Sequence, residues 1–88
     1  MTQPRIEIYT TRTCPFCIRA KQLLDRKGAS YEEIDVGADP ALRDAMTARA
    51  GRRSVPQIFL GDTHVGGCDD LYALDQAGRL DPMLRGAA

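Results

Sequence analysis

Cys14-Pro15-Phe16-Cys17 is the stretch around which this sequence is arranged, between an alternating, strand-like segment and a helix-like one. Two thiols at this spacing can form a disulfide or hold a metal. We expect Cys14 at a helix N-cap and Pro15 at the first helical position, where its missing N–H costs no hydrogen bond. The free N–H groups of the helix start then favour a thiolate at Cys14. Cys17 lies one turn deeper, so the spacing predicts an attacking thiol at Cys14 and a resolving thiol at Cys17.

Length and composition predict one globular domain over residues 1–88, with 43% hydrophobic residues. Twelve basic and twelve acidic side chains cancel, which argues against nucleic acid as a partner. We expect no membrane span, since no long apolar run is present. Met1-Thr2-Gln3-Pro4-Arg5 lacks the apolar segment of a signal peptide, and three cysteines are an odd set, unlike a disulfide framework. These features predict a cytoplasmic protein.

Hydrophobic periodicity and turn residues predict an α/β fold in the order β-α-β-α-β-β-α-α. The expected strands cover residues 5–10, 30–36, 55–60 and 63–65, and the expected helices cover 15–27, 40–50, 69–77 and 81–84. A strand, helix and strand in succession imply a right-handed crossover with parallel pairing, and the later hairpin adds antiparallel strands. The result is a four-stranded mixed sheet flanked by helices. The side chains expected in or near its core are Ile6, Ile8, Tyr9, Leu23, Leu24, Tyr31, Ile58 and Phe59.

A second informative stretch, Ser54-Val55-Pro56, lies where a loop meets the third strand. A proline at such a junction is usually trans. If it is cis, the turn presents the backbone N–H and C=O of Val55 beside Cys14, where an extended peptide can pair with them. Recognition through the backbone suits an enzyme whose substrates share a cysteine and little else.

The third stretch is Gly66-Gly67-Cys68-Asp69-Asp70. Two glycines let a ligand approach the backbone closely, and the N–H groups of Cys68 and Asp69 open a helix, which favours a carboxylate there. Asp69 has two possible roles, as the helix cap or as the partner of a ligand ammonium group. A packed, buried thiol is the expected role of Cys68, with a ligand-facing role as the alternative.

Taken together in this order, the three motifs resemble a dithiol glutaredoxin, most closely the bacterial class-3-like group, and the likeness runs from Ile6 to Leu84. The resemblance implies a thioredoxin fold, a cis peptide bond at Pro56, and glutathione as a ligand that lies across the three motifs. It implies no tightly bound cofactor, with glutathione as co-substrate. The implied partners are disulfide-bonded or glutathionylated proteins, ribonucleotide reductase among them, and we expect a monomer.

The resemblance also assigns glutathione contacts to single residues. Val55 and Pro56 would present the backbone that pairs with the glutathione cysteine. Gly67, Cys68 and Asp69 would hold the γ-glutamyl end, with its carboxylate on the N–H groups and its ammonium on Asp69. These assignments predict a glutathione-dependent thiol–disulfide oxidoreductase that reduces protein disulfides and glutathione mixed disulfides.

One departure from the family pattern concerns the cation near the first cysteine. Thr11 stands where many members have a lysine that helps bind the glycyl carboxylate of glutathione. Arg12, or Arg52 and Arg53 in the loop before the proline motif, could supply the charge, and arginine suits a carboxylate through its planar fork. The alternative for Arg12 is a merely solvated side chain. Phe16 replaces the usual tyrosine, which keeps the ring and removes a hydroxyl.

Three alternatives to this function remain open. A zinc site would need Cys14, Cys17, Cys68 and His64 to converge, although their spacing lacks paired knuckles and His64 alone is typical of a surface residue. Some glutaredoxins hold a [2Fe–2S] cluster between two protomers, using the first cysteine of each and two glutathiones, and such a carrier or sensor is the main alternative. Pro15 counts against it, because the resemblance links cluster binding to glycine or serine there. A thioredoxin-like donor is disfavoured because no tryptophan precedes the cysteine pair.

Overall fold

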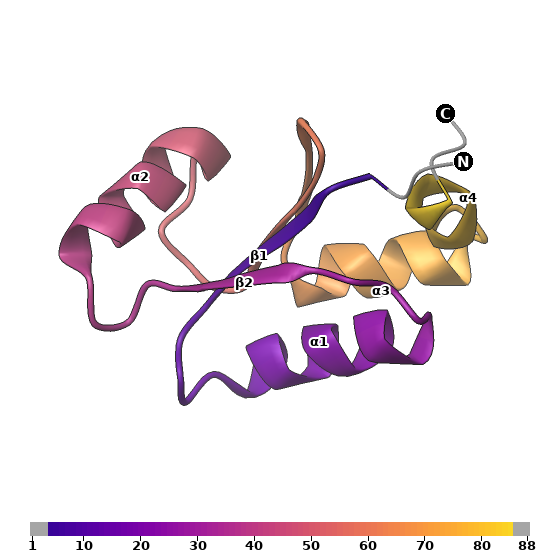
Figure 1. Cartoon of the computed structure of the whole chain (residues 1–88), viewed down its shortest axis with the longest axis horizontal. Coiled ribbons are helices and arrows are strands. Elements are labelled where there is room, and N and C mark those ends of the chain that lie inside the picture. Colours follow the sequence, from indigo (N-terminus) through magenta and orange to yellow (C-terminus); the bar gives the residue numbers. More distant parts are fainter. Residues whose placement is uncertain (1–3, 86–88) are drawn as a thin grey trace.

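The computed structural model describes residues 4–85, and Figure 1 shows the path of the chain through them. Residues 1–3, on which part of the signal-peptide expectation depends, lie outside this range. The order of elements is the predicted one, β-α-β-α-β-β-α-α. The strands are β1 (Ile6–Thr10), β2 (Glu32–Asp35), β3 (Gln57–Leu60) and β4 (Thr63–Gly66), and the helices are α1 (Pro15–Arg26), α2 (Pro40–Ala50), α3 (Cys68–Gln76) and α4 (Leu80–Leu84).

The four strands form one mixed sheet in the order β2-β1-β3-β4. β1 runs parallel to β2 and antiparallel to β3, and β3 and β4 form the predicted antiparallel hairpin. In the register of β1 with β3, Tyr9 lies opposite Gln57. The C-terminal end of β1 therefore adjoins the N-terminal end of β3, and this pairing decides which loops meet at that end of the sheet.

Helices cover both faces of the sheet, with α1 and α3 side by side on one face and α2 on the other (Figure 1). Ile6 and Ile8 of β1 point into the larger core, which α1, α3 and α4 complete, whereas Tyr9 points into a smaller core with Met46 of α2. Each fully buried Ile or Leu contributes on the order of 1.5–3 kcal/mol to folding. The predicted core and near-core residues are confirmed; Tyr31 lies at the margin, half-buried against the larger core, and donates its hydroxyl to Asp25.

The ends of several elements differ from the prediction for local reasons. β3 begins at Gln57, because Pro56 has no N–H to donate to the sheet. α3 begins at Cys68, one residue earlier than expected, and α4 begins at Leu80, ahead of the predicted start at Asp81. The longest of these helices, α1, has 12 residues. None of the helices within residues 4–85 is long and apolar enough to cross a membrane.

Candidate active site

Cys14 is the N-cap of α1, as predicted, and is half-buried. Its backbone is extended, with φ −95° and ψ 108°, and Pro15 occupies the first helical position. The Cys17 N–H donates to the Cys14 Sγ at 3.1 Å. The first turn of α1 contains no acidic residue. A hydrogen-bond donor and the positive end of the helix dipole therefore meet at this sulfur, and both stabilise negative charge on it.

The second thiol, Cys17, is 1% exposed and faces the core. Burial raises the pKa of the Cys17 thiol to about 12, and the hydrogen bond with Cys14 acts in the same direction. A backbone hydrogen bond from Thr11 and the positive charge of Lys21 oppose this rise in pKa. Cys17 is consequently a protonated thiol at neutral pH. The predicted asymmetry of exposure between the two cysteines is confirmed.

The Val55–Pro56 peptide bond is cis, as the family resemblance implied. The Val55 carbonyl oxygen lies 3.8 Å from the Cys14 Sγ. The N–H of Val55 forms no hydrogen bond with any other residue between 4 and 85. This junction thus places an unpaired backbone donor next to the half-buried Cys14.

The start of α3 lies against the same junction, because a Cβ on Gly67 would lie 3.5 Å from the Pro56 carbonyl oxygen. Gly67 is the N-cap of α3, and its N–H donates to the Asp70 Oδ2 at 2.9 Å. The possible capping role of Asp69 is therefore wrong, since Asp70, three residues after the N-cap, has the spacing of a capping box. The Asp69 side chain is exposed and forms no hydrogen bond or ion pair within the part of the chain that the structure describes.

Cys68 is the first residue of α3 and is 5% exposed. Burial raises the pKa of its thiol, and the neighbouring Asp69 carboxylate and Cys14 act in the same direction, whereas Arg19 opposes the rise. The prediction of a buried, packed thiol is confirmed. Cys68 nevertheless contributes to the wall of the depression described next.

The three motifs enclose a depression of ≈190 Å³, which we call the groove. It lies at the end of the sheet where β1 ends, β3 begins and the hairpin leads into α3. Phe16, 51% exposed, forms part of its rim. The residues that line the groove are Phe16, Arg52, Ser54, Val55, Pro56, Gln57, Gly67, Cys68, Asp69 and Asp70.

The candidate cations are separated by the structure. Arg52 lines the groove, with its guanidinium 3.7 Å from the Asp70 carboxylate. Arg53 lies outside the groove and pairs with Asp44 of α2 at 3.0 Å. Arg12 is exposed, does not line the groove, and forms no hydrogen bond or ion pair with the described residues. Of the three candidate arginines, Arg52 is therefore the one that lines the groove.

Thr11, at the position of the family lysine, is half-buried and does not line the groove. Its contribution is the backbone hydrogen bond to Cys17. Three further residues line the groove and were not predicted from the sequence as ligand contacts: Ser54, Gln57 and Asp70. A signal for Gln57 was present, because it is a polar residue in a strand whose other members are apolar, and a buried amide needs hydrogen-bond partners.

Within residues 4–85 no group of three or more His, Cys, Asp or Glu side chains is placed to hold a metal ion. The residues considered for zinc do not converge, and the Nε2 of His64 instead lies 2.7 Å from the Gln57 Oε1. His64 is half-buried, so its prediction as a surface residue is wrong in part.

Two thiols at the start of a helix, on a four-stranded sheet with a cis-proline beside them, define a thioredoxin-fold protein with a dithiol site. Comparison with known proteins agrees with this class, since residues 6–65 match the glutaredoxin family model. The chain belongs to the glutaredoxin family, whose members are generally thiol–disulfide oxidoreductases.

Relatives cover nearly the whole chain. A probable glutaredoxin from Synechocystis is 60% identical over 81 residues, 91% of this chain and 92% of that protein. Glutaredoxin 3 from Escherichia coli is 55% identical over 80 residues, 91% of this chain and 96% of that protein. The crystal structure of a buckwheat glutaredoxin–glutathione complex is similar with a TM-score of 0.88, at 32% identity, over 96% of this chain and 79% of that chain.

Proposed function

We propose that this protein is a glutathione-dependent thiol–disulfide oxidoreductase, with Cys14 as the nucleophile and Cys17 as the resolving thiol. The observation that carries the proposal is the position of the Cys14 sulfur. It lies at the N-terminus of α1 and 3.8 Å from Val55, a residue of the groove. A substrate whose sulfur reaches Cys14 from the groove would lie next to the unpaired backbone N–H of Val55.

The groove offers partners for each polar part of glutathione. The Val55 N–H is free to pair with the backbone of the glutathione cysteine. The N–H groups at the start of α3 suit the γ-glutamyl carboxylate, and the unpaired Asp69 suits its ammonium group. Arg52 suits the glycyl carboxylate through its planar fork. The crystal structure of a buckwheat relative in complex with glutathione supports this choice of ligand.

In the proposed reaction the Cys14 thiolate attacks the glutathione sulfur of a mixed disulfide. The substrate S–S bond breaks, its thiolate leaves and takes a proton, and a disulfide between Cys14 and glutathione forms. A second glutathione thiolate then attacks this disulfide, which releases oxidised glutathione and regenerates the Cys14 thiolate. With a protein disulfide, Cys17 loses its proton and attacks the Cys14 sulfur of the mixed disulfide, so a Cys14–Cys17 disulfide forms and the substrate thiolate leaves and takes a proton. Two glutathione thiols then reduce this disulfide in turn and are released as oxidised glutathione. The raised pKa of Cys17 favours the glutathione route when both are available.

The proposal treats residues 1–88 as a single glutaredoxin domain that acts as a monomer without a tightly bound cofactor. We place it in the cytoplasm, where glutathione keeps thiols reduced. Its substrates would be glutathionylated and disulfide-bonded proteins, with ribonucleotide reductase among the candidates that the family suggests.

A coupled assay with a glutathione mixed disulfide, glutathione and glutathione reductase tests the proposal. Cys14→Ser should lower turnover by at least about 10³-fold, because serine is not ionised at neutral pH. Cys17→Ser is the matched control and should keep at least about half of the wild-type rate, since glutathione replaces it. Turnover retained by Cys14→Ser contradicts the proposal, as does an equal rate of substrate-thiol release, measured directly without glutathione reductase, when 2-mercaptoethanol replaces glutathione.

A further inference from the structure

A buried amide connects β4 to the wall of the groove. Gln57, the first residue of β3, is 1% exposed. Its Nε2 donates to the Ser54 carbonyl oxygen at 3.0 Å and lies 3.3 Å from the Ser54 Oγ. Its Oε1 lies 2.7 Å from the His64 Nε2. The amide therefore links the histidine of β4 to the residue that precedes Val55.

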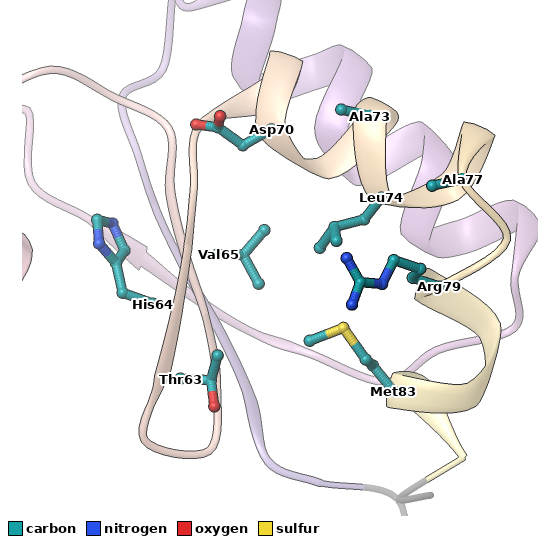
Figure 2. Close-up of a pocket in the computed structure, with 9 residues that line it drawn as sticks. All are labelled: Thr63, His64, Val65, Asp70, Ala73, Leu74, Ala77, Arg79 and Met83. Atoms are coloured by element: carbon teal, nitrogen blue, oxygen red, sulfur yellow. The ribbon is translucent and has the colours of Figure 1, made fainter. Parts of the chain in front are cut away.

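The imidazole of His64 is held in place on a second side. His64 lies opposite Phe59 in the β3–β4 register, and the two rings stack with centroids 4.8 Å apart and planes at 24°. Figure 2 shows that His64 points to the opposite side of β4 from Val65, away from Leu74. Phe59 is 2% exposed, and the Arg49 guanidinium lies 3.8 Å from its centroid. His64 thus has a fixed ring plane and a fixed partner.

The Ser54 carbonyl selects the orientation of the Gln57 amide, because a carbonyl oxygen only accepts and the NH₂ group must therefore face it. The amide oxygen then faces His64, and since it too only accepts hydrogen bonds, the His64 Nε2 carries the hydrogen in this contact. Without that donor the buried amide oxygen would lose its partner, and only the Ser54 end of the amide would be held.

The hydrogen bond to Ser54 acts on the neighbouring donor through the peptide plane. The Ser54 C=O and the Val55 N–H belong to one planar, trans peptide unit, so they point in opposite directions. Holding the oxygen inward on Gln57 turns the Val55 N–H away from Gln57. This N–H has no acceptor among the described residues. Its direction is therefore controlled from the other end of the peptide plane.

We propose that His64 is a positioning residue of the groove: by anchoring the Gln57 amide oxygen it holds the amide against the Ser54 carbonyl, fixes the Ser54–Val55 peptide plane and so aims the Val55 N–H at the ligand. The inference rests on the proposed function, which assigns this N–H to the backbone of glutathione. The role concerns binding rather than chemistry, because Cys14 is held by α1. Loss of His64 should raise the KM for the glutathione substrate and leave kcat nearly unchanged.

Three substitutions separate the hydrogen bond from packing. His64→Phe keeps the aromatic stack and removes the donor, and His64→Asn has an amide nitrogen one bond too short to replace the Nε2. His64→Gln carries its amide nitrogen the same number of bonds from Cα as the Nε2. The Phe and Asn variants should raise the KM for a glutathione mixed disulfide about tenfold, with kcat within about twofold of wild type. The Gln variant should stay within about threefold of the wild-type KM.

A second measurement does not depend on glutathione. NMR hydrogen exchange of the Gln57 side-chain amide protons in the reduced protein should be at least about tenfold faster in the Phe and Asn variants and close to wild type in the Gln variant. Wild-type KM in both the Phe and Asn variants, or an equal rise in all three variants, contradicts the inference. If the wild-type protein has no glutathione-dependent turnover, the proposed function is wrong, and the Gln57 exchange rates alone decide the role of His64.

Discussion

The two helices that begin at the groove, α1 and α3, use their N-terminal ends differently. At α1 the N-cap is Cys14, its sulfur accepts the Cys17 N–H, and the first turn carries no acidic residue. At α3 the N-cap is a glycine, two aspartates occupy the first turn, and one of them accepts the N–H of the N-cap.

Both helix starts contain a cysteine, yet their surroundings differ. Cys14 is half-buried, whereas Cys68 is buried beside Asp69, and both burial and this carboxylate raise the pKa of the Cys68 thiol. A helix N-terminus favours a negative charge, but only where no carboxylate of the same turn already occupies the position. The comparison predicts that a reactive thiol needs an uncharged first turn and partial exposure as well as a helix start.

Among substitutions at the start of α3, Gly66→Ala is expected to have the largest effect on the free energy of unfolding. Gly66 has φ 117°, a region that alanine rarely adopts, and a Cβ there would collide with the Asp70 carboxylate that caps the helix. Backbone strain and loss of the cap together should lower the free energy of unfolding by about 2–4 kcal/mol. Urea denaturation measures this change.

Gly67→Ala is the matched control, because Gly67 has φ −94° and its added Cβ would meet only the Pro56 oxygen, at 3.5 Å. It should change the free energy of unfolding by less than about 1 kcal/mol. Equal losses for the two alanine variants would show that the cap at Asp70 and the φ of Gly66 do not explain the effect.

The buried thiol of α1 predicts a pH dependence of stability. Burial raises the pKa of Cys17 to about 12, whereas an unfolded thiol ionises near its ordinary value of about 8.5. The folded state therefore retains a proton that the unfolded state loses. The stabilisation from this thiol is fully present below about pH 8.5 and declines as pH rises towards 12, by at most about 1.4 kcal/mol per pH unit.

Urea unfolding of the reduced protein between about pH 7 and 10.5 measures this decline. Cys17→Ala should give a shallower decline than wild type, and Tyr31, whose pKa burial also raises to about 12, should keep part of the decline in this variant. The comparison uses the slopes and not the absolute stabilities, since the substitution leaves a small cavity. If the free energy of unfolding of Cys17→Ala fell with pH as steeply as that of wild type, Cys17 would not be the source of the decline.

The two aspartates of α3 should separate stability from binding. Asp70→Ala removes the acceptor of the Gly67 N–H and should lower the free energy of unfolding by about 1 kcal/mol. Asp69→Ala removes an exposed carboxylate without a partner and should change the free energy of unfolding by less than about 0.5 kcal/mol. The same substitution should raise the KM for the glutathione substrate. Thermal melts and the coupled assay on both variants test this. If Asp69→Ala destabilised the protein more than Asp70→Ala does, Asp69 and not Asp70 would be the residue that caps α3.

Much of the fold follows from short-range signals in the sequence. Asp39 and Pro40 begin α2 and Gly51 ends it with φ 76°, as cap preferences predict. The convergence of the three motifs follows in turn from the antiparallel pairing of β1 with β3. Residue type and spacing were sufficient to predict the helix ends, because each capping signal acts within a few residues.

The remaining details depend on contacts between distant segments. Arg52 and Arg53 are neighbours in the sequence, which does not show which of them lies at the groove. In the structure Arg53 pairs with Asp44 on α2, whereas Arg52 lies near Asp70 at the groove. The contact of Gln57 with His64 likewise requires the register of β3 with β4. The capping role of Asp70 could have been predicted, since it follows the N-cap by three residues.

The smallest expected effect is a change in the reactivity of Cys14 when a carboxylate is added to the first turn of α1, as in the first turn of α3. Ile18, 48% exposed, lies at the end of this turn, and its N–H donates to the Cys14 carbonyl at 3.2 Å. Ile18→Glu places a carboxylate near the Cys14 sulfur, which disfavours negative charge there, while the same carboxylate interacts favourably with the helix dipole. Reactivity and stability should therefore change in opposite directions.

Alkylation of Cys14 by iodoacetamide at pH 7, followed by mass spectrometry, measures the reactivity. At low salt the Glu variant should react about two- to threefold more slowly than the matched Ile18→Gln variant, which corresponds to the 0.3–1 kcal/mol typical of a charge at a helix end. The difference should vanish at about 1 M salt, where the Debye length falls to about 3 Å. Equal rates for the two variants at low salt would mean that the uncharged first turn of α1 does not contribute to the reactivity of Cys14.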